Sequence, residues 1–209
     1  AKEIEKAIAY VLFQMAEQSV KQGQYQKGAE SYLALVKRYP LIDIADKAVF
    51  EAGAAYEKDQ QFTKAAETFM ILPKQYAKSP LTIKGIVRAG DAHKKAANLK
   101  KSDKAYYEQE YREAAQTYLF ITNNFPQDSM AFMAIGSAAQ VYDTIADKKS
   151  AAVTYELAYK RYPKDERTPG YLYSACLSYD EAKMTDEAIR CNKDLVRDYP
   201  KSSYALDAA

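Results

Sequence analysis

Five copies of an eleven-residue motif recur along the chain, and this internal repeat restricts the fold more than any other feature of the 209 residues. Successive copies start 37, 49, 37 and 37 residues apart. The copies are QGQYQKGAESY from Gln22, DQQFTKAAETF from Asp59, EQEYREAAQTY from Glu108, IADKKSAAVTY from Ile145 and AKMTDEAIRCN from Ala182. A period of this length is typical of proteins that stack one small structural element many times.

Each copy carries the signals of a helix that packs closely against a neighbour. The seventh residue of every copy is small: Gly28, Ala65, Ala114, Ala151 and Ala188. Four residues later the first four copies have an aromatic residue: Tyr32, Phe69, Tyr118 and Tyr155. The fifth copy has Asn192 at this position. Residues four apart share one face of a helix. The small residue lets two helices approach, and the aromatic fills the space beside it.

Four repeats close on an aromatic residue followed by proline: Tyr39-Pro40, Phe125-Pro126, Tyr162-Pro163 and Tyr199-Pro200. Proline ends a helix because it lacks the backbone N–H and disfavours helical geometry in the residue before it. Seven Gly and seven Pro in the whole chain are too few for the regular turns of a β-sandwich or β-barrel. The repeat is therefore predicted to be a helix–turn–helix whose apolar stripe is buried by stacking on its neighbours.

The composition argues against several classes of function. The net charge of +2 gives no general attraction to nucleic acid. One His and two Cys exclude two-His metal motifs and a four-Cys zinc site. No apolar run approaches the roughly 18 residues of a membrane span. No phosphate-binding loop and no isolated carboxylate pair is present, so we expect no catalytic residues, no metal and no cofactor.

The first repeat, residues 9–40, resembles the tetratricopeptide repeat (TPR). The family's key positions fall on Leu12, Met15, Ala16, Ser19, Gly28, Tyr32, Leu35 and Pro40. The resemblance continues in residues 46–80, 83–126, 132–163 and 169–200, with the start of a sixth repeat at 202–209. It implies an all-α, right-handed superhelix (solenoid) of five helix pairs plus a partial sixth, about eleven helices in one domain over residues 1–209.

The period of 37 rather than the common 34 is similar to that of repeats in bacterial cell-envelope proteins. Examples are the Tol–Pal-associated division coordinator and the lipoprotein subunit of the outer-membrane β-barrel assembly machine. This resemblance implies a periplasmic or outer-membrane-associated protein, with the cytoplasm as the alternative. The chain opens on a charged stretch rather than a secretory signal, and we expect it to be a fragment of a longer protein.

The family resemblance implies a non-catalytic scaffold that binds a protein or peptide partner in a concave groove lined by the first helix of each repeat. By family position the groove residues are Tyr10, Phe13, Gln14, Glu17, Lys47, Phe50, Glu51, Lys84, Arg88, Asp91, Gln140, Tyr173 and Leu177. Phe13, Phe50 and Tyr173 are expected to be binding anchors, because packing within the repeat does not require them. Some members of the family hold the terminal carboxylate of a chaperone with Lys, Asn and Arg at set groove positions, and this sequence lacks those residues there. The alternatives are a self-assembling solenoid and a regulatory domain of a larger enzyme.

The longer spacing of 49 residues reflects an insertion at about residues 94–105. Its composition predicts a helical hairpin with both arms extended. Residues 73–105 contain nine Lys or Arg and two acidic residues. The basic residues of the hairpin are Lys94, Lys95, Lys100, Lys101 and Lys104. Two interpretations stay open, a solvated surface loop or a contact surface for an acidic protein segment or an anionic envelope surface.

His93 and the two cysteines are the remaining candidates for chemistry. His93 occupies a position where the third repeat expects an aromatic that faces the neighbouring helix, so we expect it to pack rather than to catalyse. Cys176 falls at the small-residue position and is expected to be a small buried hydrophobe. A disulfide with Cys191 is the alternative in an oxidising compartment.

Overall fold

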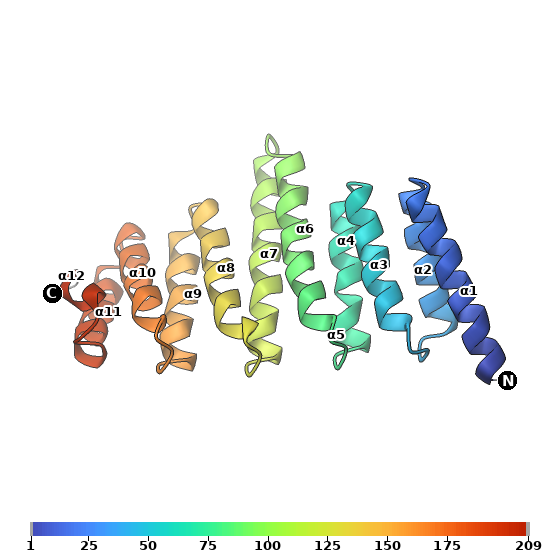
Figure 1. Cartoon of the computed structure of the whole chain (residues 1–209). Coiled ribbons are helices and arrows are strands. Elements are labelled where there is room, and N and C mark those ends of the chain that lie inside the picture. Colours follow the sequence, from blue (N-terminus) through green and yellow to red (C-terminus); the bar gives the residue numbers. More distant parts are fainter. Residues whose placement is uncertain (1, 208–209) are drawn as a thin grey trace. The chain divides into compact units, whose positions relative to one another are not determined.

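The computed structural model describes residues 2–207, and within this range every regular element is a helix (Figure 1). The first helices of the successive repeats are α1 (Lys2–Lys21), α3 (Ala45–Lys58), α6 (Thr82–Leu99), α8 (Met130–Thr144) and α10 (Thr168–Glu181). The second helices are α2 (Tyr25–Arg38), α4 (Phe62–Phe69) with α5 (Ile71–Gln75), α7 (Lys104–Asn124), α9 (Lys148–Arg161) and α11 (Thr185–Asp198), and α12 (Ser203–Asp207) starts a sixth pair. The predicted all-α array of helix pairs is confirmed.

The described residues contain twelve helices where about eleven were expected, because one second helix is divided in two. The division lies at Met70, between α4 and α5. Pro73 explains it, since proline cannot donate a hydrogen bond to the carbonyl of Phe69, four residues earlier, and its ring crowds that carbonyl.

The chain divides into two compact units, Ala1–Thr117 and Tyr118–Ala209, with the boundary inside α7. We call them the N-terminal unit and the C-terminal unit and describe each by itself. In the N-terminal unit α2 packs against both α1 and α3, and α4 packs against both α3 and α6. In the C-terminal unit α9 packs against α8 and α10. A single continuous domain over residues 1–209 stays a prediction.

The small residues of the repeat motif lie at close helix contacts, as their spacing predicts. Ala65, Ala114 and Ala151 are fully buried. Gly28 stands where the TPR family usually has alanine, and its contact is closer still. A methyl group at Gly28 would overlap the side chain of Val20 and would lie 3.2 Å from the carbonyl oxygen of Ala16. Glycine is therefore required by packing at this position.

A tyrosine near the end of a repeat forms a hydrogen bond to the proline carbonyl that closes the preceding repeat. The hydroxyl of Tyr76 donates to the Pro40 carbonyl at 3.0 Å in the N-terminal unit. In the C-terminal unit the Tyr162 hydroxyl donates to Pro126 at 3.1 Å and the Tyr199 hydroxyl to Pro163 at 2.8 Å. Each bond joins a tyrosine to a carbonyl 36 residues earlier, so that the same connection recurs between three pairs of adjacent repeats.

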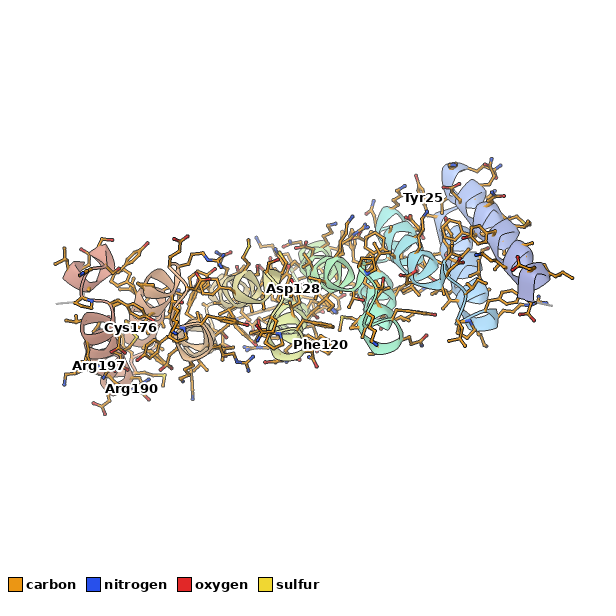
Figure 2. The ribbon with its side chains drawn as sticks, turned by 60° about the horizontal axis from the view of Figure 1, so that its bottom comes forward. Tyr25, Phe120, Asp128, Cys176, Arg190 and Arg197 are labelled. Carbon is orange, nitrogen blue, oxygen red and sulfur yellow. A yellow bond between two sulfur atoms is a disulfide. The ribbon has the colours of Figure 1, made fainter. Side chains whose placement is uncertain are left out.

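Cys176 and Cys191 form a disulfide that joins α10 to α11, with a Cα–Cα distance of 5.4 Å. Figure 2 shows Cys176 together with Arg190, which precedes the second cysteine on α11. The expectation that Cys176 is a free hydrophobe is therefore wrong, and the disulfide alternative is correct. Both cysteines are buried at the contact of the two helices, where the small-residue position of one helix faces the other.

A buried carboxylate joins three helices of the same unit. Glu156 on α9 is 2 % exposed and accepts hydrogen bonds from the Tyr179 hydroxyl at 2.7 Å and from Arg190 at 2.8 Å. Lys160 lies 3.1 Å away. Burial acts to raise the pKa of Glu156, but the bonds from Arg190, Tyr179 and Lys160 outweigh it, and the pKa lies below its ordinary value.

Candidate partner-binding surfaces

Ten of the thirteen residues that the sequence assigns to a groove lie on α1, α3 and α6, the first helices of the N-terminal unit. Figure 1 shows these three helices. We call the surface that carries these residues the first-helix face. Five of the predicted residues are exposed: Tyr10, Gln14, Glu17, Lys47 and Lys84. Three more are half-buried: Glu51, Arg88 and Asp91. The polar part of the prediction thus lies on the surface of one unit, while the concave shape of the groove stays a prediction.

Phe13 and Phe50 are core residues, and their interpretation as free anchors is wrong. Phe13 is 9 % exposed and its ring lies 4.9 Å from that of Tyr32, centroid to centroid. Phe50 is 7 % exposed and lies 5.5 Å from Phe69. Packing does require these rings, because each fills the space beside the aromatic of the second helix.

The surface above the two buried rings is cationic. The Lys47 ammonium lies 5.2 Å from the centroid of the Phe13 ring, and the Lys84 ammonium lies 5.1 Å from that of Phe50. Each lysine therefore comes from the repeat that follows its phenylalanine. These are cation–π distances, and they hold both ammonium groups close to the protein surface.

Other cations of the first-helix face are paired with carboxylates. Arg88 and Lys95 both contact Glu57, the latter at 3.3 Å. Lys6 pairs with Asp43 at 2.8 Å, and its hydrogen bond lowers the pKa of the Asp43 carboxyl. Within residues 2–207 the ammonium groups of Lys47 and Lys84 form no ion pair with a carboxylate, so that their charges are open to a partner.

The C-terminal unit carries the three remaining predicted residues on a neutral surface. Gln140 on α8 is exposed, and Leu177 on α10 is 49 % exposed. Tyr173 is half-buried, and its ring lies 5.5 Å from that of Tyr204 on α12. Met133 on α8 is also 49 % exposed. It is one surface residue that the sequence interpretation missed, although it occupies the repeat position of Lys47 and Lys84.

The insertion forms the predicted helical hairpin. The two arms, α6 with 18 residues and α7 with 21, exceed the 14 residues of α2 and α3. The hairpin extends beyond the turn between α3 and α4 (Figure 1). Asp103 caps α7, since its carboxylate accepts from the backbone N–H of Tyr106 at 3.1 Å.

The five basic residues of the hairpin have different surroundings. Lys94 lies 3.5 Å from Asp91, Lys95 pairs with Glu57, and Lys104 lies 3.7 Å from Glu108. These three belong to helices rather than to the loop. Lys100 and Lys101 lie at the tip, where the Lys100 ammonium is 4.5 Å from the Tyr106 ring centroid. The charge available to a partner therefore lies at the tip.

His93 packs between the arms of the hairpin. Its Nδ1 atom lies 2.7 Å from a carboxylate oxygen of Glu110, and both side chains are largely buried. This contact across α6 and α7 agrees with a packing position. The sequence interpretation missed Glu57, which contacts Arg88 and Lys95, and Glu110, which contacts His93. The partners of these two carboxylates lie 17 to 38 residues away in the chain.

Three parts of the chain match the sequence model of the tetratricopeptide repeat: residues 10–41, 47–79 and 171–202. Each of these three segments is similar to a tetratricopeptide repeat. The first two TPR segments lie in the N-terminal unit and the third lies in the C-terminal unit. Among curated proteins, none matches the chain.

Solved structures similar to this chain include two that are named as TPR proteins. A thermophilic TPR protein from Thermus thermophilus shares 16 % identity at a TM-score of 0.43, over 96 % of this chain and 94 % of that one. A tetratricopeptide repeat protein from Parabacteroides merdae shares 13 % identity at a TM-score of 0.48, over 96 % and 72 %. The MamA protein shares 16 % at a TM-score of 0.43, over 92 % of both chains.

Within residues 2–207 no helix has both the length and the apolarity of a membrane span. Within the same residues, His, Cys, Asp and Glu side chains do not gather in threes in a way that would hold a metal ion.

Proposed function

We propose that the chain is a non-catalytic scaffold that binds a protein or peptide partner along the first-helix face, within a bacterial envelope complex. The observation that carries the proposal is that Lys47 and Lys84 occupy equivalent positions of adjacent repeats, each over a buried phenylalanine ring. Within residues 2–207 neither ammonium group forms an ion pair. Charged groups on an interaction surface steer a partner and fix its register. A TPR array supplies the rigid support that such a surface needs.

Site-specific photo-crosslinking in cells tests this function. A photoreactive amino acid at Gln14, on the first-helix face, is expected to capture a partner protein, whereas the same group at Lys37, exposed on α2, is not. The double variant Lys47→Glu with Lys84→Glu should weaken the capture at Gln14. Equal capture at both positions, or capture that the double variant does not change, would contradict the proposal.

The envelope localisation belongs to the same proposal. The Cys176–Cys191 disulfide supports it, because disulfides persist in oxidising compartments such as the bacterial periplasm and are rare in the cytosol. Alkylation of free thiols in cells that are quenched with acid and denatured, with and without prior reduction, tests it directly. We expect both cysteines to react only after reduction. Immediate reaction would place the chain in a reducing compartment.

Self-association is a second candidate, favoured by an apolar stripe on α1. Ile4, Ile8, Val11 and Met15 are between 39 % and 66 % exposed and follow one another at helical spacing. In α3 the equivalent positions include Ala48, which is fully buried. Sedimentation velocity of the Val11→Lys variant tests this candidate, since loss of an oligomer that the parent chain forms would support it.

A further inference from the structure

A cleft of about 250 Å³ lies in the N-terminal unit, outside the residues assigned to the first-helix face. One wall is the turn between α3 and α4 with the start of α4, residues 60–64. The other wall is the hairpin, which contributes Ala96, Leu99, Lys100 and Tyr106. The hairpin wall therefore comes from the insertion and from Tyr106 just beyond it.

The two walls are held in place by specific contacts. The Tyr106 hydroxyl lies 3.4 Å from the Thr63 hydroxyl, which joins the hairpin to α4. Asp103 fixes the start of α7 beside it. The Lys95 ammonium lies 5.7 Å from the centroid of the Phe62 ring, a second contact between the same elements. The cleft is thus a built feature and not a gap between mobile loops.

The interior of the cleft is apolar. Leu99 is the last residue of α6 and leaves 59 % of its surface exposed at the cleft. Phe62 is half-buried and Ala96 is buried, so that both add apolar surface. Covering the exposed part of Leu99 with another apolar side chain would be favourable, at about 25 cal/mol for each Å² removed from water.

The rim of the cleft is cationic. Lys64 and Lys100 are exposed lining residues, and neither forms an ion pair within residues 2–207. Their ammonium groups lie over aromatic rings, Lys64 at 5.7 Å from the Tyr56 centroid and Lys100 at 4.5 Å from that of Tyr106. Of the acidic residues near these lysines in sequence, Asp59 accepts from Gln61 and Asp103 accepts from the Tyr106 backbone, while Glu67, three residues after Lys64, is exposed.

We propose that this cleft docks a short acidic segment of a partner protein, which inserts one apolar side chain against Leu99 and Phe62 and places carboxylates beside Lys64 and Lys100. The cleft, at about 250 Å³, is smaller than small-molecule pockets, which are roughly 300–1,000 Å³. This size agrees with the insertion of one side chain of a docked segment. The charge of the rim selects an acidic segment, and the apolar interior distinguishes such a segment from a simple polyanion. The inference is independent of the function proposed for the first-helix face.

A binding titration with the full chain tests the inference. The probe is a short fluorescein-labelled peptide in which glutamates flank a central leucine, measured by fluorescence anisotropy at low salt. We expect saturable binding that weakens at least tenfold in the Lys64→Glu, Lys100→Glu double variant and about fivefold in Leu99→Ser. Binding should also weaken as salt rises, because the ion pairs are at the surface.

Matched variants separate the cleft from general charge and hydrophobicity. Lys37→Glu changes an exposed lysine on α2, and Leu41→Ser changes a leucine that is 98 % exposed in the following loop. Both are expected to keep the parent affinity, as is Lys47→Glu on the first-helix face. Circular dichroism verifies that every variant is folded.

Three outcomes would overturn the inference. The first is absence of saturable binding at millimolar peptide. The second is equal weakening by Lys37→Glu and by the cleft variants. The third is equal affinity for a peptide with alanine in place of the central leucine, since this would indicate attraction of any polyanion, including an anionic membrane or nucleic acid, without use of the apolar interior.

Discussion

At the scale of single residues, the turn inside four of the five helix pairs depends on one residue in the left-handed backbone region. Gly23, Gln60, Ala146 and Lys183 have φ values of 79°, 58°, 57° and 61°. After Ala146, the N–H of Asp147 donates back to the Tyr142 carbonyl at 2.9 Å, and the other three turns close in the same way. This is the pattern of a helix C-terminus that favours glycine, and the first repeat alone among these four provides one.

Replacement of Ala146 by Gly should stabilise the protein. The left-handed conformation costs a residue with a Cβ about 1–2 kcal/mol, whereas the extra freedom of glycine in the unfolded chain costs roughly 0.5–1 kcal/mol. We expect a gain of about 0.5 kcal/mol in Ala146→Gly and a comparable loss in Gly23→Ala, where nothing lies within 4 Å of an added methyl group. Urea denaturation measures both.

The control for this pair is Ala182→Gly, which changes an alanine with ordinary helical geometry, φ −75°. It should lower the unfolding free energy, because only the entropic cost remains. A loss of stability in Ala146→Gly as large as that in Ala182→Gly would show that the left-handed turn carries no penalty that glycine relieves.

At the scale of helices, the bond from Tyr76, Tyr162 and Tyr199 to the preceding repeat is a regular connection outside the apolar core. Burial raises the pKa of the Tyr76, Tyr162 and Tyr199 hydroxyls, which therefore stay protonated and able to donate. Phe125 occupies the same position in the third repeat and has no hydroxyl to donate.

The Tyr199→Phe variant should lose about 1 kcal/mol of unfolding free energy, since it removes one hydrogen bond and keeps the ring. Tyr39→Phe is the matched control, because within residues 2–207 the Tyr39 hydroxyl makes no equivalent bond. Thermal denaturation compares the two variants with the parent chain. Equal melting temperatures for all three proteins would show that the bond to Pro163 contributes nothing to stability.

The helix pairs were predictable from the sequence because their signals are local. Small and aromatic residues four apart, together with the Tyr-Pro ends, locate the helices and their boundaries without reference to the rest of the chain. The extended hairpin was predictable for the same reason, from a longer spacing and helix-favouring residues. The break between α4 and α5 was missed, although Pro73 carries its signal.

The parts of the candidate surfaces that were not predictable depend on side-chain direction across helices. Lys47 and Lys84 are exposed as their repeat position suggests, but the same rule gave Phe13 and Phe50 an exposure that the core removes. The Cys176–Cys191 pairing likewise depends on which faces of α10 and α11 meet. The cleft at the hairpin needs the insertion and the turn of the previous repeat together, and no motif in either one indicates it.

At the scale of the whole molecule, stability should be a sum over neighbouring repeats rather than a property of one central core. Helices α1 to α6 of the N-terminal unit pack against their neighbours in the chain, and so do helices α8 to α12 of the C-terminal unit. In arrays of this kind a local weakening affects the repeat that carries it and its immediate neighbours.

Removal of the disulfide tests this locality. It closes a loop with a sequence separation of 15 residues, for which chain entropy gives about 3 kcal/mol. In the Cys176→Ala, Cys191→Ala variant we expect faster amide hydrogen exchange in α10, α11 and α12 and unchanged exchange in α1 to α4. Mass spectrometry of peptic fragments resolves these segments. A uniform increase along the chain would show that the molecule unfolds as one cooperative body.

The tyrosine-to-proline bond has a consequence for how such a chain can grow. A copy of residues 127–163, inserted after Pro163, would bring its own hydroxyl donor and its own carbonyl acceptor. Its tyrosine would bond to the proline before it, and its proline would receive the tyrosine after it. Tandem duplication of a single 37-residue segment of the gene would therefore carry this bond into the longer array, because each added copy contains both its donor and its acceptor.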